Sequence, residues 1–260
     1  MGLGRVVLIT GCGGTLGRAY CRTLLESGYR VIATDILGAR FSAICTEFSG
    51  YKEFYAVELD VTDETVIASV FDNIIAEGLA PNVVINNAAI TGEFLLNEMN
   101  HFPDLSSTTR EMWEKALNVN LTGAFLIARE MDRRLVGVVD TKLVNVSSVY
   151  GVRAPHHEIY EKMEFKSFAA YSASKAGIHG LTLWLASYWG KFGVTVNTLA
   201  PGGVNNNHSP DFVSKLSGLT ILDRMAEADD IAMTMRFLVS DESRYLTGQL
   251  ISCDGGFSAW

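Results

Sequence analysis

Short apolar runs alternate with segments of helical spacing along most of the chain. Residues 6–10 form a continuous apolar run, as expected of a strand buried on both faces. Residues 16–27 have helical spacing and end at Gly28, a usual helix stop. The same patterns predict strands at 30–34, 54–59, 82–86, 142–147, 194–199 and 249–253, and helices at 39–49, 63–77 (capped by Thr62), 108–134, 171–191 and 227–239. This alternation predicts one α/β domain over residues 1–260, with a mostly parallel, seven-stranded sheet and helices on both of its faces.

Three stretches interrupt the alternation, at residues 90–107, 152–169 and 203–224. Each follows the carboxyl end of a predicted strand, which is where open α/β sheets bind ligands, so we expect substrate-binding loops there. Surface decoration is the alternative for each stretch. The polar side chains in these stretches suit a polar ligand, although each is equally compatible with a solvated loop; they are Asn97, Asn100, His101, Arg153, His156, His157, Asn205 and Asn206.

Composition narrows the classes of partner. The 260 residues carry a net charge of -8, and this acidic balance argues against nucleic acid and anionic membranes as partners. The scattered cysteines form no C-x-x-C pair, which predicts reduced thiols in a cytoplasmic protein and no metal site; they are Cys12, Cys21, Cys45 and Cys253. No charged leader precedes a long apolar run, and the apolar runs are too short for a membrane span.

Tyr171 and Lys175 open the long apolar segment predicted to be a helix at 171–191. Residues four apart on a helix share a face, so the phenol and the ammonium can approach one another. A neighbouring cation lowers the pKa of a phenol, which then transfers a proton near neutral pH. The alternative is a tyrosine and a lysine that merely share a helix surface.

A glycine-rich turn lies between the first strand and the first helix, in the sequence Thr10-Gly11-Cys12-Gly13-Gly14-Thr15-Leu16-Gly17. Such a turn lets the backbone approach a pyrophosphate at the helix N-terminus, as in a Rossmann fold. Asp35 ends the second strand 18 residues after Gly17, where a carboxylate binds the ribose hydroxyls of NAD and repels the 2′-phosphate of NADP. The alternative for Asp35 is a solvated strand end, and nearby Arg40 could weaken the preference for NAD.

With these pieces in order, almost the whole chain resembles the short-chain dehydrogenase/reductase family, in its single-domain branch. The resemblance rests on the glycine turn together with Leu59-Asp60-Val61-Thr62, Asn86-Asn87-Ala88-Ala89, Val119-Asn120-Leu121, Asn145-Val146-Ser147-Ser148, Tyr171-x-x-x-Lys175, Pro201-Gly202-Gly203 and Asp254-Gly255-Gly256. Jointly these motifs are far more specific than any one of them.

The resemblance implies a doubly wound Rossmann fold and assigns roles residue by residue. The implied catalytic residues are Asn120, Ser148, Tyr171 and Lys175. Tyr171 would exchange the proton on the substrate oxygen, Ser148 would hold the carbonyl, and Asn120 would hold Lys175 through a water chain. The implied cofactor-binding residues are Gly11, Gly14, Thr15, Leu16, Gly17, Asp35, Asp60, Val61, Asn87, Ala88, Ala89, Tyr171, Lys175, Pro201, Gly202 and Val204. A homodimer or homotetramer built on helices 108–134 and 171–191 and the last strand is also implied.

The chain departs from the family pattern in three places. Thr15 stands where this branch usually has glycine, and Asn205-Asn206-Asn207-His208 replaces the usual Thr or Ser after the Pro-Gly turn. Ser148 and Tyr171 are 23 residues apart, about twice the usual gap. Tyr160 lies closer to the usual spacing, but Glu164 occupies the position where a lysine is needed, so Tyr171 is the better candidate.

A narrower resemblance concerns the substrate. Val149-Tyr150-Gly151-Val152, Leu185-Ala186-Ser187-Tyr188 and Asp254-Gly255-Gly256-Phe257 look like bacterial oxidoreductases of flagellin-modification and legionaminic-acid-type sugar pathways. This implies NAD-dependent hydride transfer at a secondary alcohol or ketone of a small, polar, sugar-like molecule. A ketoacyl-type carbonyl reductase and a non-catalytic NAD-binding protein are the alternatives.

Overall fold

The computed structural model describes residues 4–92, 102–138, 140–161 and 163–260. Seven strands form one sheet in the order β3-β2-β1-β4-β5-β6-β7, and neighbouring strands are all parallel. The strands are β1 (Val6–Thr10), β2 (Arg30–Asp35), β3 (Phe54–Glu58), β4 (Val83–Asn86), β5 (Lys142–Val146), β6 (Thr195–Pro201) and β7 (Leu250–Cys253). The predicted doubly wound α/β fold is confirmed.

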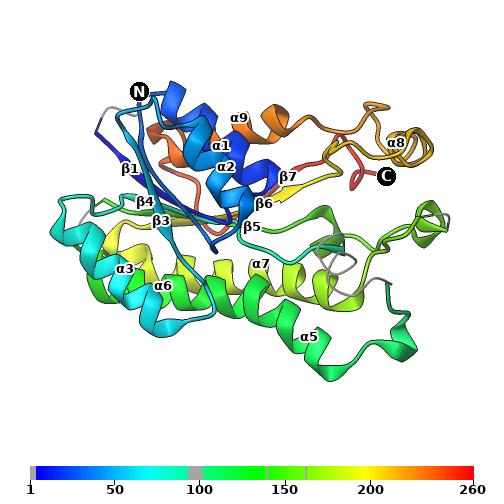
Figure 1. Cartoon of the computed structure of the whole chain (residues 1–260), viewed down its shortest axis with the longest axis horizontal. Coiled ribbons are helices and arrows are strands. Elements are labelled where there is room, and N and C mark those ends of the chain that lie inside the picture. The colour runs from blue at the N-terminus through cyan, green and yellow to red at the C-terminus, as the bar shows by residue number, and fades with distance from the viewer. Residues whose placement is uncertain (1–3, 93–101, 139, 162) are drawn as a thin grey trace.

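Helices cover both faces of the sheet (Figure 1). One face carries α1 (Thr15–Glu26), α2 (Ala39–Glu47) and α9 (Ala228–Val239). The other carries α3 (Glu64–Ala76), α5 (Arg110–Leu117), α6 (Gly123–Arg134) and α7 (Ala169–Trp189). A short helix, α8 (Pro210–Ser217), lies beyond the sheet near the C-terminus. Within the described residues no helix combines the length and apolarity that crossing a membrane requires.

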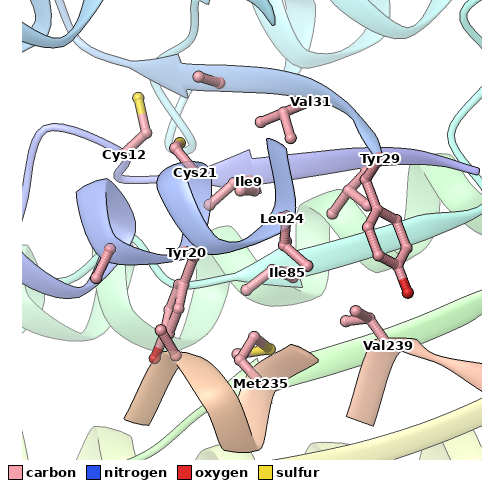
Figure 2. Packing of buried hydrophobic residues seen from close by; sticks show 14 of the residues in the cluster. Ile9, Cys12, Tyr20, Cys21, Leu24, Tyr29, Val31, Ile85, Met235 and Val239 are labelled. Atoms are coloured by element: carbon pink, nitrogen blue, oxygen red, sulfur yellow. The ribbon is translucent and has the colours of Figure 1, made fainter. Parts of the chain in front are cut away.

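The continuous apolar run of β1 is explained by burial on both faces. Ile9 belongs to the core between the sheet and α1 and α9, where Tyr20 of α1 reaches towards Met235 of α9 (Figure 2). Its neighbour Leu8 belongs to the opposite core, together with Phe71 of α3. Successive strand residues point to opposite faces, so a central parallel strand such as β1 buries both sets of side chains and is mainly apolar.

The structure corrects four local predictions. Asp63, and not Thr62, caps α3, because the Asp63 carboxylate accepts hydrogen bonds from the backbone of the first turn while the Thr62 hydroxyl donates to Asp60. The helix predicted at 108–134 is two helices, α5 and α6, joined by a π-helical turn at Asn118–Thr122. The stretch 203–224 contains α8, which the pattern of the sequence did not predict, and α7 begins two residues before the predicted start.

Candidate active site

A cavity of about 1040 Å³ opens at the carboxyl ends of the strands. The strand order changes direction between β1 and β4, and open α/β sheets place their ligand sites at such a switch point. The cavity runs from the glycine turn after β1, past the ends of β4 and β5, to the inserted segments around 160–168 and 203–216. Parallel strands therefore bring together motifs that are far apart in the sequence.

The glycine turn requires glycine at two positions. Gly11 has a φ of +67°, and a Cβ there would lie 2.6 Å from the Cα of Ala88. A Cβ on Gly17 would overlap the carbonyl oxygen of Gly11, so the start of α1 packs directly on the turn. Thr15, the departure from the family pattern, is the first residue of α1 and is exposed. The turn therefore has its tight geometry with threonine at this position.

Two side chains hold this turn in place. The amide of Asn87 donates to the carbonyl oxygens of Thr10 and Gly11, at 3.0 Å and 2.9 Å. The Asp35 carboxylate at the end of β2 accepts from the backbone N–H of Gly13 at 2.7 Å. The turn backbone, the N-terminus of α1 and this carboxylate together form a cradle that fits the pyrophosphate and ribose of a dinucleotide.

Asn120 lies in the π-helical turn between α5 and α6, and is 2% exposed. Its side-chain oxygen accepts from the backbone N–H of Ile90 at 2.7 Å, and its amide donates to the carbonyl of Ile90 at 3.2 Å and to the Ser174 hydroxyl at 3.1 Å. A π-helical turn adds a residue to the helix and is frequent at functional sites. Asn120 thus joins the segment after β4 to Ser174 of α7, the residue directly before Lys175. Asn120 itself does not line the cavity.

Ser148, Tyr171 and Lys175 meet at the cavity wall. Ser148 follows β5, and its side chain is near enough to that of Tyr171 on α7 to lower the pKa of the phenol. The Lys175 ammonium lies 5.7 Å from the centre of the Tyr171 ring and donates to the carbonyl of Val146 at 2.8 Å. Two hydroxyl groups at one point of a concave wall can bind a single carbonyl oxygen.

The pKa shifts of Tyr171 and Lys175 differ from the prediction. Burial raises the pKa of Tyr171, and the hydrogen bond with Ser148 partly offsets the increase; Lys175 does not lower it. Burial lowers the pKa of Lys175 from 10.5 to about 8. The spacing of four residues correctly predicted that the phenol and the amine lie close together. In the structure, however, the Lys175 ammonium donates to the carbonyl of Val146. Burial in low-dielectric surroundings is the main cause of the pKa shift of both groups. Tyr171 is therefore a protonated hydroxyl, suited to donating a proton.

Nearly all predicted site residues line the cavity. Of the four expected catalytic residues Ser148, Tyr171 and Lys175 do so, as does every expected cofactor-binding residue, from Gly11 to Val204. Tyr160, the rejected alternative to Tyr171, also lines the cavity, but its hydroxyl faces Tyr150 and not a lysine.

The polar loop residues are scattered. Asn206 lines the cavity, whereas Arg153 donates to the carbonyl of Ser258 and His156 packs on Phe257. Asn97, Asn100 and His101 lie outside the described residues. The wall also contains aromatic side chains that the sequence analysis did not assign to the site; they are Tyr150, Phe165, Phe168, His208 and Phe212. The signal for Tyr150, Phe165 and Phe168 was the density of aromatic residues between 150 and 168, a stretch that does not include His208 or Phe212. Among the described residues no cluster of three potential metal ligands occurs.

Comparisons with known proteins agree with this geometry. Residues 13–258 match a family model described as enoyl-(acyl carrier protein) reductase. The post-translational flagellin modification protein A of Campylobacter coli is 29% identical over 97% of this chain and 98% of that protein. The 3-oxoacyl-(acyl-carrier-protein) reductase FabG of Thermotoga maritima is 30% identical over 97% of each. Galactitol 2-dehydrogenase (L-tagatose-forming) of Cereibacter sphaeroides is 30% identical over 99% of this chain and 96% of that protein.

A solved structure with a bound cofactor is also similar. A short chain dehydrogenase from Leptospira borgpetersenii with bound NAD+ superposes with a TM-score of 0.84 and 29% identity, covering 98% of this chain and 93% of that one.

Proposed function

This chain belongs to the short-chain dehydrogenase/reductase family of oxidoreductases, and we propose that it transfers hydride between NAD and a secondary alcohol or ketone of a polar, sugar-like substrate. One observation carries the proposal. The side chains of Ser148 and Tyr171 line the same cavity as the glycine turn and Asp35. A carbonyl held by the first pair is thus reachable by a dinucleotide held by the second group.

Each side chain has a distinct part in the proposed reaction. The bound nicotinamide supplies or accepts the hydride. Tyr171 donates its proton to the carbonyl oxygen during reduction and takes it back during oxidation. Ser148 holds the same oxygen through its hydroxyl and orients the carbonyl. Lys175 binds the nicotinamide ribose, and Asn120 is a positioning residue that fixes the start of α7.

The preference for NAD over NADP rests on Asp35. Its carboxylate lines the cavity beside the glycine turn, where it repels a 2′-phosphate and accepts hydrogen bonds from ribose hydroxyls. We expect Asp35→Asn to lower the ratio of kcat/KM with NAD to kcat/KM with NADP at least tenfold, because the mutation removes the repulsion and one set of acceptors. Arg40 is exposed beside the turn, so Arg40→Ala should shift the ratio the opposite way. An unchanged ratio in Asp35→Asn contradicts this assignment.

The sugar-like substrate is supported by the narrower resemblance and by the polyol dehydrogenase among the relatives. A second candidate is a ketoacyl-type carbonyl reductase, favoured by the FabG relative and by the aromatic wall of the cavity. Assaying polyols and ketoses against acyl thioesters with both cofactors separates these two.

The decisive test of the reaction is Tyr171→Phe. With the best substrate of that panel we expect kcat to fall by at least 100-fold, because the proton donor is removed, while NADH binding persists. Tyr51→Phe, which removes a hydroxyl from an exposed side chain outside the cavity, is the matched control and should retain activity. Unchanged turnover by Tyr171→Phe refutes the proposed chemistry. NADH binding without turnover of any substrate favours the non-catalytic alternative.

We also propose that the chain acts as one dinucleotide-binding unit in a cytoplasmic homodimer or homotetramer. Large apolar side chains are exposed on the helices expected to form the contact; they are Trp113, Phe125, Leu183, Trp184 and Tyr188. Trp184 and Tyr188 are exposed on α7 and stack with ring centres 4.7 Å apart. A light-scattering mass equal to one 28.4 kDa chain rejects the oligomer.

A further inference from the structure

Two tyrosines in the cavity wall share a hydrogen bond. The hydroxyl oxygens of Tyr150 and Tyr160 lie 2.8 Å apart, and both residues line the cavity. Tyr150 belongs to a 3₁₀ turn at Val149–Gly151, directly after Ser148. Tyr160 ends a second 3₁₀ turn at His157–Tyr160, within the inserted segment that doubles the usual gap between Ser148 and Tyr171. The insertion thus brings a second phenol to the first.

Aromatic packing fixes the direction of both phenols. The Tyr160 ring lies 5.9 Å from that of Phe165 and 5.6 Å from that of Phe212, which comes from α8. The Tyr150 ring meets Phe257 edge-on at 6.2 Å. Phe212 and Phe257 are buried, and Tyr160 is 6% exposed. A small separate core therefore anchors the pair, and its hydroxyls are held without the freedom of a loop side chain.

The hydrogen bond between Tyr150 and Tyr160 leaves one phenol O–H without an acceptor in the described part of the chain. Each phenol carries one O–H and two lone pairs, and the mutual bond uses one hydrogen and one lone pair. No described residue besides the partner tyrosine bonds either hydroxyl. One O–H donor and further lone pairs are thus left to the cavity. Buried polar groups are normally satisfied, so an unspent donor in an aromatic wall points to a ligand atom or a water.

The pair stands close to the reacting hydroxyls. The backbone N–H of Tyr150 donates to the Ser148 side chain at 3.2 Å. Burial is the main cause that raises the pKa of both Tyr150 and Tyr160, and charge on Tyr171 adds to the increase, so the three phenols lie within electrostatic reach of one another. A carbonyl held by Ser148 and Tyr171 therefore lies in the same cavity as the phenol pair.

We propose that Tyr150 and Tyr160 bind a second oxygen of the substrate, a hydroxyl close to the reacting carbonyl, and so make the site selective for hydroxy ketones and polyols. The proposal rests on the proposed function and names its substrate class. A plain ketone or an acyl chain leaves the unspent O–H facing an apolar group, and sites built to bond a hydroxyl reject analogues that lack it. Ser148 and Tyr171 thus bind the carbonyl oxygen, and the Tyr150–Tyr160 pair binds the second oxygen.

The test compares ketones that differ by hydroxyl groups. NADH oxidation is followed with 3-hydroxy-2-butanone against 2-butanone, and with L-tagatose against 2-hexanone. For wild type we expect kcat/KM to be at least 100-fold higher for the hydroxylated member of a pair. Tyr160→Phe and Tyr150→Phe should each reduce that ratio by 10- to 100-fold, mainly by lowering kcat/KM for the hydroxylated ketone. Tyr20→Phe removes a buried hydroxyl far from the cavity, in the core between α1 and α9, and should leave the ratio unchanged.

The outcomes separate this inference from the proposed reaction. A wild-type enzyme that does not prefer the hydroxylated member of either pair overturns the inference. So does a ratio that stays constant in both variants while their melting temperatures and NADH affinities match wild type. If a Tyr→Phe variant unfolds, Tyr160→Trp and Tyr150→His are used instead, because each keeps an N–H donor on an aromatic ring. These variants must restore part of the preference for the hydroxylated ketone. If they do not, the inference is also overturned. Activity that requires Tyr171 but shows no preference leaves the proposed reaction standing.

Discussion

Burial of the Lys175 ammonium has a measurable consequence for stability. Lys175 is 3% exposed, and burial lowers its pKa from 10.5 to about 8 in the folded protein. Between these two values the folded chain has lost a proton that the unfolded chain still holds. The free energy of unfolding therefore rises with pH across this window, and each pH unit contributes up to 1.36 kcal/mol.

The magnitude follows from the two pKa values. Over the whole window Lys175 contributes about 3 kcal/mol, of which about 2.5 kcal/mol is gained between pH 7 and pH 10. Lys175→Met fills similar space and cannot titrate. We therefore expect the difference in unfolding free energy, wild type minus Lys175→Met, to increase by about 2.5 kcal/mol from pH 7 to pH 10. Other titrating groups are common to both chains and cancel in the difference.

Urea unfolding followed by circular dichroism at pH 7, 8, 9 and 10 measures this difference. One protein concentration must be used throughout, because the stability of an oligomer depends on concentration. Lys191→Met, which replaces an exposed lysine, controls for the loss of a lysine. A difference for Lys175→Met that is flat, or that decreases as the pH rises, refutes the reasoning from burial.

Two further predictions test the packing at the glycine turn and in the core between α1 and α9. Gly17→Ala places a Cβ against the carbonyl oxygen of Gly11, so we expect a loss of about 1–3 kcal/mol in unfolding free energy and at least tenfold weaker NADH binding by fluorescence titration. Gly180→Ala on α7, where a Cβ meets nothing within 4 Å, is its control and should be stabilising; equal behaviour of the two variants contradicts the close packing of the turn. Tyr20→Phe removes a buried hydroxyl that has no hydrogen-bond partner among the described residues, so thermal unfolding should show stabilisation by about 1 kcal/mol. A loss of that size would mean that the hydroxyl is bonded.

Much of the fold and the site was predictable from the sequence for a physical reason. Strands buried on both faces leave continuous apolar runs, and helix stops such as Gly28 mark the ends between them. The glycine turn and the Tyr171–Lys175 spacing are local, so their geometry is written within a few residues. The predicted Thr62 cap was wrong because Thr62 and Asp63 are both good caps, and only the backbone geometry decides which side chain faces the first turn.

The sequence by itself determined the order of strands and helices and the local chemistry of each motif, since both depend on neighbouring residues. Tertiary structure alone decided which distant groups meet. In the folded chain the π-helical turn at Asn120 lets this side chain form hydrogen bonds with the backbone of Ile90. The Lys175 ammonium donates to the carbonyl of Val146, and the hydroxyls of Tyr160 and Tyr150 share a hydrogen bond. The pKa values of buried groups, and the pairing of side chains from separate segments, depend on how tertiary packing excludes water from them. A local pattern of residues does not contain that information.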